Sequence, residues 1–277
     1  MPRRIWSRSE AVFMGNRRLK PNDCTDPTSS AVVSLTSFGE RLKTLPLTIK
    51  SILAGTTKPR RLVLWVTDAE RSLVSPDVLA FCSRGLEVRF CPDYGPHKKY
   101  ILTLGELEGS DILVTADDDV LYPKKWLSTL IAAREESPEC VVAFRAKRML
   151  FDHGRIAPYA TWPMVRSAVP SLAHVSTGVS GVAFPKALVS GLLEVGLGFT
   201  EKAPRADDLW IHSVAVSNGI MTRQVRSRPR EFFEVPGTRS TSLMRTNVGG
   251  GGNDAQILST YSDELVSRIE RSLNGAD

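Results

Sequence analysis

A chain of 277 residues with 42% hydrophobic and 24% charged side chains can bury a large core and has the composition of a globular protein. Lysine and arginine exceed aspartate and glutamate by 36 − 30 = 6, which favours anionic partners such as lipid head groups or phosphorylated substrates. Nucleic acid is not an expected partner, because no recognition motif occurs and aromatic residues make up only 7% of the chain.

Secreted and membrane-spanning classes are not expected either. No apolar stretch approaches the roughly 18 residues that cross a bilayer, and residues 1–6 lack the apolar centre of a secretory signal. The four cysteines are scattered, with no C-x-x-C pair. We therefore expect a reduced, cytoplasmic protein, and the basic excess also allows peripheral attachment to the inner face of a membrane.

The first half of the chain alternates between strand and helix patterns. Residues 1–30 are basic and rich in turn residues, which predicts an irregular arm. The strands predicted beyond it are 31–36, 61–67, 86–91 and 112–116, and the helices are 42–53, 76–84 and 98–107. This alternation predicts right-handed crossovers and an α/β fold with a mostly parallel, Rossmann-like sheet flanked by helices.

The second half follows the same alternation less regularly. Its predicted elements are a helix at 124–136, a strand at 141–144, a glycine-punctuated strand at 174–185, a helix at 207–218, a flexible glycine loop at 247–253 and an amphipathic helix at 262–273 capped by Ser262. We expect a single domain at 31–225, with the arm before it and a C-terminal extension at 226–277 after it.

Three consecutive carboxylates, Asp117, Asp118 and Asp119, follow the apolar run 112–116. Open α/β sheets bind ligands at the carboxyl ends of their strands, so the acids mark a candidate site. Asp117 and Asp119 point to one side if the extended geometry continues. Adjacent negative charges require a cation, and carboxylate oxygens suit Mg²⁺ or Mn²⁺. An acidic surface turn is the alternative, which the flanking apolar sequence disfavours.

A second acidic pair, Asp207 and Asp208, stands at the start of the predicted helix 207–218. A carboxylate held within reach of an incoming hydroxyl can act as its general base. Helix capping is the alternative, and it accounts for aspartate at this position without any catalytic role.

Basic residues stand at three further places. The segment Gly95-Pro96-His97-Lys98-Lys99 delivers two lysines to a helix amino terminus, where backbone N–H groups and ammonium charges suit a phosphate. Arg41 follows the first strand and can approach a phosphate or ribose from the same sheet edge. Four arginines cluster near the C-terminal end, at Arg223, Arg226, Arg228 and Arg230. A solvated basic surface is the alternative for each.

In their order along the chain, these segments resemble the family 2-like glycosyltransferases of the GT-A fold, and most closely the bacterial transferases that build surface polysaccharide. The resemblance covers about residues 31–225 and rests on V-V-S-L-T-S-F, L-W-V-T-D, G-P-H-K-K-Y, V-T-A-D-D-D-V-L-Y-P, S-G-V-A-F-P and A-D-D-L-W. It implies a nucleotide-sugar donor, Mn²⁺ or Mg²⁺, a glycan or lipid-linked acceptor, and inversion at the sugar carbon.

The resemblance also implies roles for individual residues. The metal ligands come from Asp117, Asp118 and Asp119, and the donor contacts are Thr36, Arg41, Asp68, His97, Lys98, Asp117 and Asp118. Asp208 is the implied catalytic base, with Asp207 as the other acid of the pair. Ser180, Gly181 and Trp210 lie near the acceptor. The loop Gly249–Gly252 is expected to fold over the bound donor.

Two other classes of protein remain open. Asp117-x-Asp119 after an apolar strand resembles the nucleophile motif of haloacid dehalogenase-type phosphohydrolases, although that nucleophile usually follows the first strand. A non-catalytic basic protein that binds anionic membranes or a partner is the other class.

Overall fold

The computed structural model describes residues 9, 11–15, 19, 24–238 and 251–275. The described residues form two compact units. The first is drawn from Met1–Asp93, Lys98–Ile131 and Glu231–Ser242, and the second from Tyr94–His97, Ala132–Arg230 and Leu243–Asp277. The expected C-terminal extension is thus divided between the two units.

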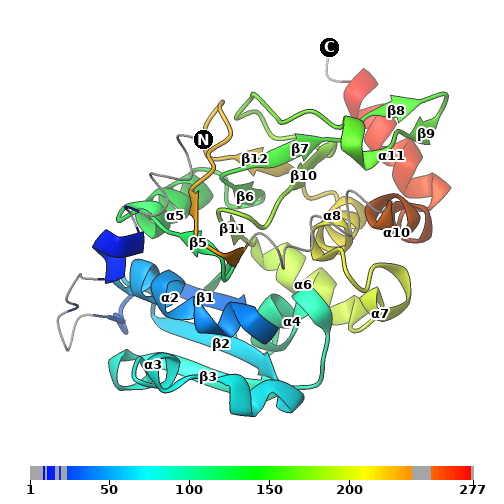
Figure 1. Ribbon diagram of the computed structural model, residues 1–277. Helices are drawn as coiled ribbons and strands as arrows, with labels where there is room; N and C mark the ends of the chain where they lie inside the picture. Colours follow the sequence, from blue (N-terminus) through cyan, green and yellow to red (C-terminus); the bar gives the residue numbers. More distant parts are fainter. Residues whose placement is uncertain (1–8, 10, 16–18, 20–23, 239–250, 276–277) are drawn as a thin grey trace. The chain divides into compact units, whose positions relative to one another are not determined.

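The first unit contains four parallel strands in the order β4-β1-β2-β3 (Figure 1). Their bounds are Ala31–Thr36 for β1, Arg61–Thr67 for β2, Leu86–Cys91 for β3 and Ile112–Ala116 for β4. In register, Val32 of β1 lies opposite Arg61 of β2 and Leu113 of β4. All four strands agree with the sequence prediction. Strands β1, β2 and β4 are largely buried apolar runs, whereas β3 is a partly exposed edge strand that also carries Glu87 and Arg89.

Helices and short antiparallel strands complete the first unit. They are η1 (Gly39–Lys43), α2 (Leu45–Leu53), η2 (Asp68–Leu73), α3 (Pro76–Leu79), η3 (Cys82–Arg84) and α4 (Lys98–Leu104), with β5 (Val120–Leu121) paired to β13 (Phe233–Glu234). Helix α4 packs on β1, β2 and β4. The helix predicted at 76–84 is instead one short α-helix and one 3-10 turn, followed by Gly85 at φ 93.

The N-terminal arm is not wholly irregular. Residues 11–15 are helical, and Ala11 is buried against Leu121 and Val235 of the first unit. A short apolar contact of this kind is enough to order a terminal segment. The sequence prediction missed it because the surrounding residues are basic and polar.

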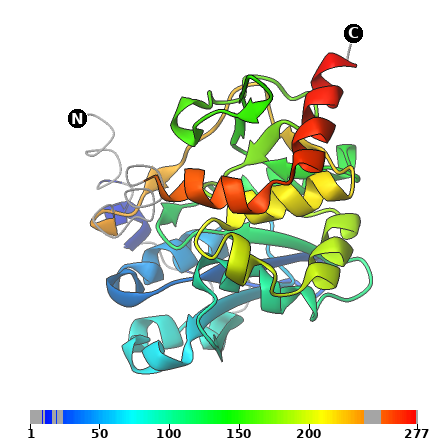
Figure 2. The same ribbon diagram turned by 90° about the vertical axis from the view of Figure 1, so that its right-hand side faces the viewer.

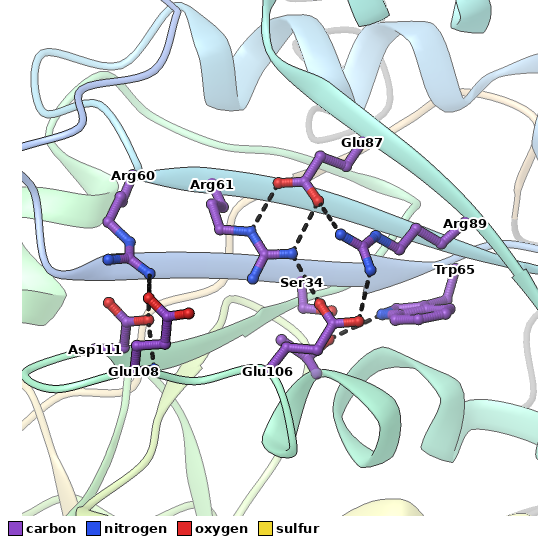
Figure 3. A network of polar contacts seen from close by, with 10 residues as sticks. Ser34, Arg60, Arg61, Trp65, Glu87, Arg89, Glu106, Glu108 and Asp111 are labelled. Atoms are coloured by element: carbon purple, nitrogen blue, oxygen red, sulfur yellow. Dashed lines mark hydrogen bonds and ion pairs between the residues drawn. The ribbon is translucent and has the colours of Figure 1, made fainter.

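An ion-pair network covers part of the sheet in the first unit (Figure 3). Arg61 of β2 binds Glu87 of β3 through two hydrogen bonds of 2.7 and 2.8 Å, and it also binds Glu106 at 2.8 Å. Arg89 closes the ring with bonds of 2.6 Å to each of the two glutamates. Both arginines therefore bridge two carboxylates, which lowers the pKa of Glu87 chiefly through the Arg61 hydrogen bond.

The second unit contains a mixed three-stranded arrangement in which β6 (Val141–Ala143) pairs with β12 (Thr222–Gln224) in parallel and with β11 (Val182–Ala183) in antiparallel. Two further antiparallel pairs are β7 (Ala146–Arg148) with β10 (His174–Ser176) and β8 (Phe151–Asp152) with β9 (Arg155–Ile156). The helical elements are η4 (Gly95–His97), η5 (Tyr159–Thr161), α6 (Lys186–Val195), α7 (Phe199–Lys202), α8 (Asp207–Ser217), α10 (Gly252–Thr260) and α11 (Asp263–Asn274). Helix α5 (Trp126–Glu136) begins in the first unit and ends in the second.

The prediction of a single strand at 174–185 is wrong. It is two strands, β10 and β11, separated by a turn in which Ser180 and Gly181 both have φ 96. A positive φ is incompatible with an extended strand, and glycine tolerates it best.

Helix α8 is the central element of the second unit, and α10 and α11 pack against it (Figure 2). Ser262 caps α11 as predicted, accepting a hydrogen bond from the Leu265 N–H group. The prediction of a flexible loop at 247–253 is wrong at its C-terminal end, because Gly252 and Asn253 belong to α10. Residues 247–250 lie outside the described part. Among the described helices, none is long and apolar enough to cross a membrane.

His212 of α8 is a fully buried histidine held in its neutral form. Its Nε2 lies 2.8 Å from the Leu172 carbonyl, which only accepts, so Nε2 carries the proton. Nδ1 then accepts from the Tyr261 hydroxyl at 2.7 Å. Burial lowers the pKa of His212 from 6.5 to about 4.

This shift predicts acid-labile stability. Since the unfolded chain binds a proton near pH 6.5 and the folded chain only near pH 4, stability is complete above pH 6.5 and falls as pH drops towards 4. The difference corresponds to about 3 kcal/mol. His212→Gln is expected to flatten the dependence of Tm on pH across this window, although it lowers Tm at pH 7.

The control is His153→Asn. The His153 side chain is 96% exposed, and asparagine tolerates its backbone φ of 48. An unchanged pH profile in His212→Gln would contradict the assignment of a buried neutral imidazole.

Candidate functional site

Asp118 is the residue that fixes the acid triplet, which consists of Asp117, Asp118 and Asp119. The carboxylate is 2% exposed and accepts hydrogen bonds from Ser37 Oγ at 2.6 Å and Arg41 Nη1 at 2.5 Å. Its main-chain carbonyl accepts another from Thr48 Oγ1 at 2.8 Å. Because both oxygens already have protein partners, Asp118 holds the end of β4 against the segment that follows β1.

Arg41 links Asp118 to Asp119. Its second terminal nitrogen donates to Asp119 Oδ2 at 2.5 Å. Burial raises the pKa of Asp119 to about 7, although the Arg41 charge opposes the rise, and Asp117, Asp118 and Glu234 add to it. Burial is therefore the main reason why the Asp119 carboxyl holds its proton more tightly than a free carboxyl does.

The triplet does not continue as an extended strand. The chain turns at Asp118 and Asp119, so these two share Arg41, whereas Asp117 Oδ1 accepts from Lys99 Nζ at 2.9 Å. The expectation that Asp117 and Asp119 point together depended on extended geometry, which the turn removes. Within the described chain, Asp117 Oδ2 and Asp119 Oδ1 have no protein hydrogen bond.

These two oxygens fit a hard divalent cation in donor type and charge. Among the described residues, no group of three or more histidine, cysteine or acidic side chains is arranged to hold a metal ion. A cation here would therefore take one or two carboxylates and complete its shell with water and substrate oxygens, which is usual for Mg²⁺.

Lys99 was missed by the sequence reasoning, which selected its neighbour Lys98. Lys99 has a side chain that is 7% exposed and reaches the acid triplet, whereas Lys98 binds Asp93 at 2.6 Å. Both lysine side chains are buried, and the sequence alone does not indicate which of them reaches the acids.

Thr36 and Asp68 lie at strand ends in the first unit, as predicted, and each has a hydrogen-bond partner within the protein. Thr36 Oγ1 at the end of β1 donates to the Trp65 carbonyl at 2.8 Å. Asp68 follows β2 and forms an exposed ion pair with Arg71 at 2.9 Å. Only Asp68 retains a largely exposed side chain, which leaves it accessible to a ligand.

The acidic pair of the second unit occupies the first turn of α8, where a negative charge is favoured by the helix dipole. The capping alternative is not observed, because Ala206 is the N-cap residue. Instead, Asp208 Oδ1 accepts a hydrogen bond from the Gly178 N–H group at 2.9 Å. The structure thus joins Asp208 to the glycine-rich segment that precedes β11, thirty residues earlier in the chain.

Two buried tyrosines adjoin this pair, and sequence reasoning identified neither. Burial raises the pKa of Tyr159 above its usual range, and the negative charges of Asp208 and Asp207 raise it further. Tyr261 shows the same rise, again chiefly through burial. Both hydroxyls therefore stay protonated beside Asp208 at neutral pH. No sequence signal identifies them, since they lie 49 and 53 residues away in the chain.

His97 and Trp210 are packing residues in this structure. His97 is fully buried, binds the Ala203 carbonyl at 2.7 Å and stacks on Phe199 at 3.9 Å between ring centroids. The ring is thus held by the protein itself, and its expected role as a donor contact stays a prediction. Trp210 is 5% exposed and packs edge-on against Phe199. Its expected acceptor role likewise stays a prediction.

Ser180 and Gly181 lie in the turn before β11. Ser180 is fully buried, and the Gly181 N–H group donates to the Gly178 carbonyl at 2.9 Å. This bond closes the turn that presents the Gly178 N–H group to Asp208. The pair therefore supports the acidic site through the backbone.

Comparison with known proteins identifies the fold. No family model and no curated protein matches the chain. The mannosyltransferase PcManGT from Pyrobaculum calidifontis, solved with GDP-Man and Mn²⁺, is 15% identical, with 99% of this chain and 83% of that chain covered and a TM-score of 0.51. S. aureus TarS 1–349 is 15% identical, with coverage of 90% and 73% and a TM-score of 0.52.

A second TarS structure, in complex with UDP-GlcNAc, gives 15% identity, coverage of 89% and 72%, and a TM-score of 0.51. At this level of identity the likeness establishes the fold alone. The chain has the expected α/β architecture of the GT-A type, with mostly parallel strands flanked by helices.

The contacts of Asp118 predict that its main role is to stabilise the fold. Asp118→Ala is expected to lower the free energy of unfolding by about 3 kcal/mol, because it breaks a buried ion pair and leaves Ser37 without its acceptor. Urea unfolding measures the loss. The control, Asp68→Ala, breaks an exposed ion pair and should change stability by less than about 1 kcal/mol. Equal losses in the two variants would contradict the anchoring role.

Proposed function

We propose that the protein is an inverting, metal-dependent glycosyltransferase that moves a sugar from a nucleotide-sugar donor to a hydroxyl of a glycan or lipid-linked acceptor in surface polysaccharide synthesis. One observation supports this most strongly. In a GT-A-type fold, the three carboxylates that follow the buried strand β4 are paired with two cations among the described residues, Arg41 and Lys99, and oxygens of Asp117 and Asp119 are left for a ligand.

The first unit supplies the donor side of the proposed reaction. Asp117 and Asp119 would hold Mn²⁺ or Mg²⁺ through their remaining oxygens, and Asp118 would fix the turn that carries them. When bound, the cation supplies positive charge that stabilises the departing nucleoside diphosphate. Lys99 keeps Asp117 in position, and Asp68, exposed after β2, is available to the nucleoside.

The second unit supplies the acceptor side. Asp208 would take the proton of the attacking hydroxyl as the new glycosidic bond forms, with Asp207 beside it in the same helical turn. The Gly178 N–H group occupies one lone pair of Oδ1 and orients the carboxylate.

The two rival classes have less support. A haloacid dehalogenase-type nucleophile usually follows the first strand, whereas here β1, β2 and β3 precede the acids along the chain. A non-catalytic role gives no function to the carboxylate oxygens of Asp117 and Asp119 that lack a protein partner within the described chain. Robust metal-dependent turnover of a generic phosphate ester would support the phosphohydrolase instead.

The proposal predicts different defects for the two acidic sites. Asp119→Asn should abolish the rise in Tm that Mn²⁺ and a nucleoside diphosphate produce together, since a ligand bound to the native state raises its stability. Sugar transfer should fall with it. A panel of nucleotide sugars screened by thermal shift identifies the donor first.

Asp208→Asn should keep that rise in Tm and lose transfer by about 10²- to 10⁴-fold, as expected for removal of a general base. Asp152→Asn, which changes a carboxylate that is 75% exposed in the second unit, is the matched control and should behave as wild type. Near-normal transfer by Asp208→Asn would rule out its role as the base.

A further inference from the structure

The arginine-rich segment after β12 has no role in the proposed reaction. It reads Val225-Arg226-Ser227-Arg228-Pro229-Arg230, and together with Phe144 it lines a hollow of about 390 Å³ in the second unit. Ligand pockets of small molecules typically measure about 300–1,000 Å³, so this hollow is large enough for a small ligand.

Both ends of the segment are fixed to the same strand end. The Val225 N–H group donates to the Ala143 carbonyl at 2.9 Å, and the Arg230 N–H group donates to the Phe144 carbonyl at 3.0 Å. Because two backbone bonds hold the ends, the arginines between them are presented on an ordered loop. Preorganisation of this kind lowers the entropic cost of binding a ligand.

The buried side chain of Gln224 supports the loop from below. Its Oε1 accepts from the Ala146 N–H group at 3.0 Å, and its Nε2 donates to the Val165 carbonyl at 2.9 Å. The same nitrogen lies 3.4 Å from the Arg226 carbonyl. A fully buried amide with this many partners fixes the direction in which the loop leaves β12.

The arginines of this region differ in their partners. Arg223 binds Glu136 at 2.9 Å and Ser137 at 2.5 Å, so it is neutralised within the structure. Arg226 and Arg228 are exposed, and neither forms an ion pair with any described residue. Two uncompensated guanidinium groups at one hollow create a local positive potential that is available to an anion.

We propose that this hollow binds a phosphate ester, with the phosphate held by Arg226 and Arg228 and the organic part over the apolar floor of Phe144, Val225 and Pro229. The planar guanidinium fork matches phosphate oxygens in pairs, which an ammonium group does not. A concave site with an apolar floor favours a discrete ligand over a flat membrane surface. The inference does not depend on the proposed transfer reaction.

Calorimetric titration of the full chain with phenyl phosphate and with inorganic phosphate tests the proposal. Metal-free buffer is used, so that binding at the acid triplet does not contribute. Both probes are expected to bind, phenyl phosphate more tightly. The double variant Arg226→Gln/Arg228→Gln should weaken phenyl phosphate at least tenfold, and Arg226→Lys/Arg228→Lys should lie between it and wild type.

The matched control is Arg148→Gln/Arg155→Gln, which removes the same charge from two other exposed arginines of the second unit. It should bind phenyl phosphate within twofold of wild type. Equal weakening in both double variants would overturn the proposal, because only net charge would then matter. Binding to anionic phospholipid vesicles without binding to either phosphate probe would also overturn it, in favour of a membrane surface.

Discussion

The buried carboxylate of Asp118 is the constraint on which the candidate site depends. A buried charge is tolerated only when it is paired and hydrogen-bonded, and Asp118 meets this condition through Arg41 and Ser37. Those partners follow β1, whereas Asp118 follows β4, so one carboxylate ties two parallel strand ends together. The turn that results separates the three adjacent acids into one structural anchor and two residues with oxygens left for a ligand.

A comparable constraint orders the second unit. Asp208 is held by a backbone N–H group from the turn before β11, a turn that requires positive φ at two successive residues. The buried tyrosines Tyr159 and Tyr261 surround it and stay protonated. Tyr261 also donates to His212 in the middle of α8, so the same tyrosine that adjoins Asp208 contributes to the packing of that helix.

The parallel strands β1 to β4 and helix α8 could be predicted from the sequence, because the local pattern of apolar, acidic and turn residues favours them. The predictions that differ from the structure also have physical reasons. The strand at 174–185 was broken by a turn at Ser180 that only the surrounding structure imposes. Gly252 joined a helix because α10 packs against α8, a contact that outweighs the low helix propensity of glycine. The stacking of His97 on Phe199, far along the chain, was not predicted.

By itself, the sequence determined that acids follow a buried strand, that a second acidic pair begins a helix, and that four arginines cluster between residues 223 and 230. Only the tertiary structure decided which of these charged side chains are paired with other residues of the protein. Lys99 rather than Lys98 reaches Asp117, and Arg41 binds two of the three acids. Arg223 is neutralised by Glu136, unlike Arg226 and Arg228, which form no ion pair with a described residue. The reason is that residue types and local periodicity are set along the chain, whereas the partners of a charged side chain are set by contacts between segments far apart in it.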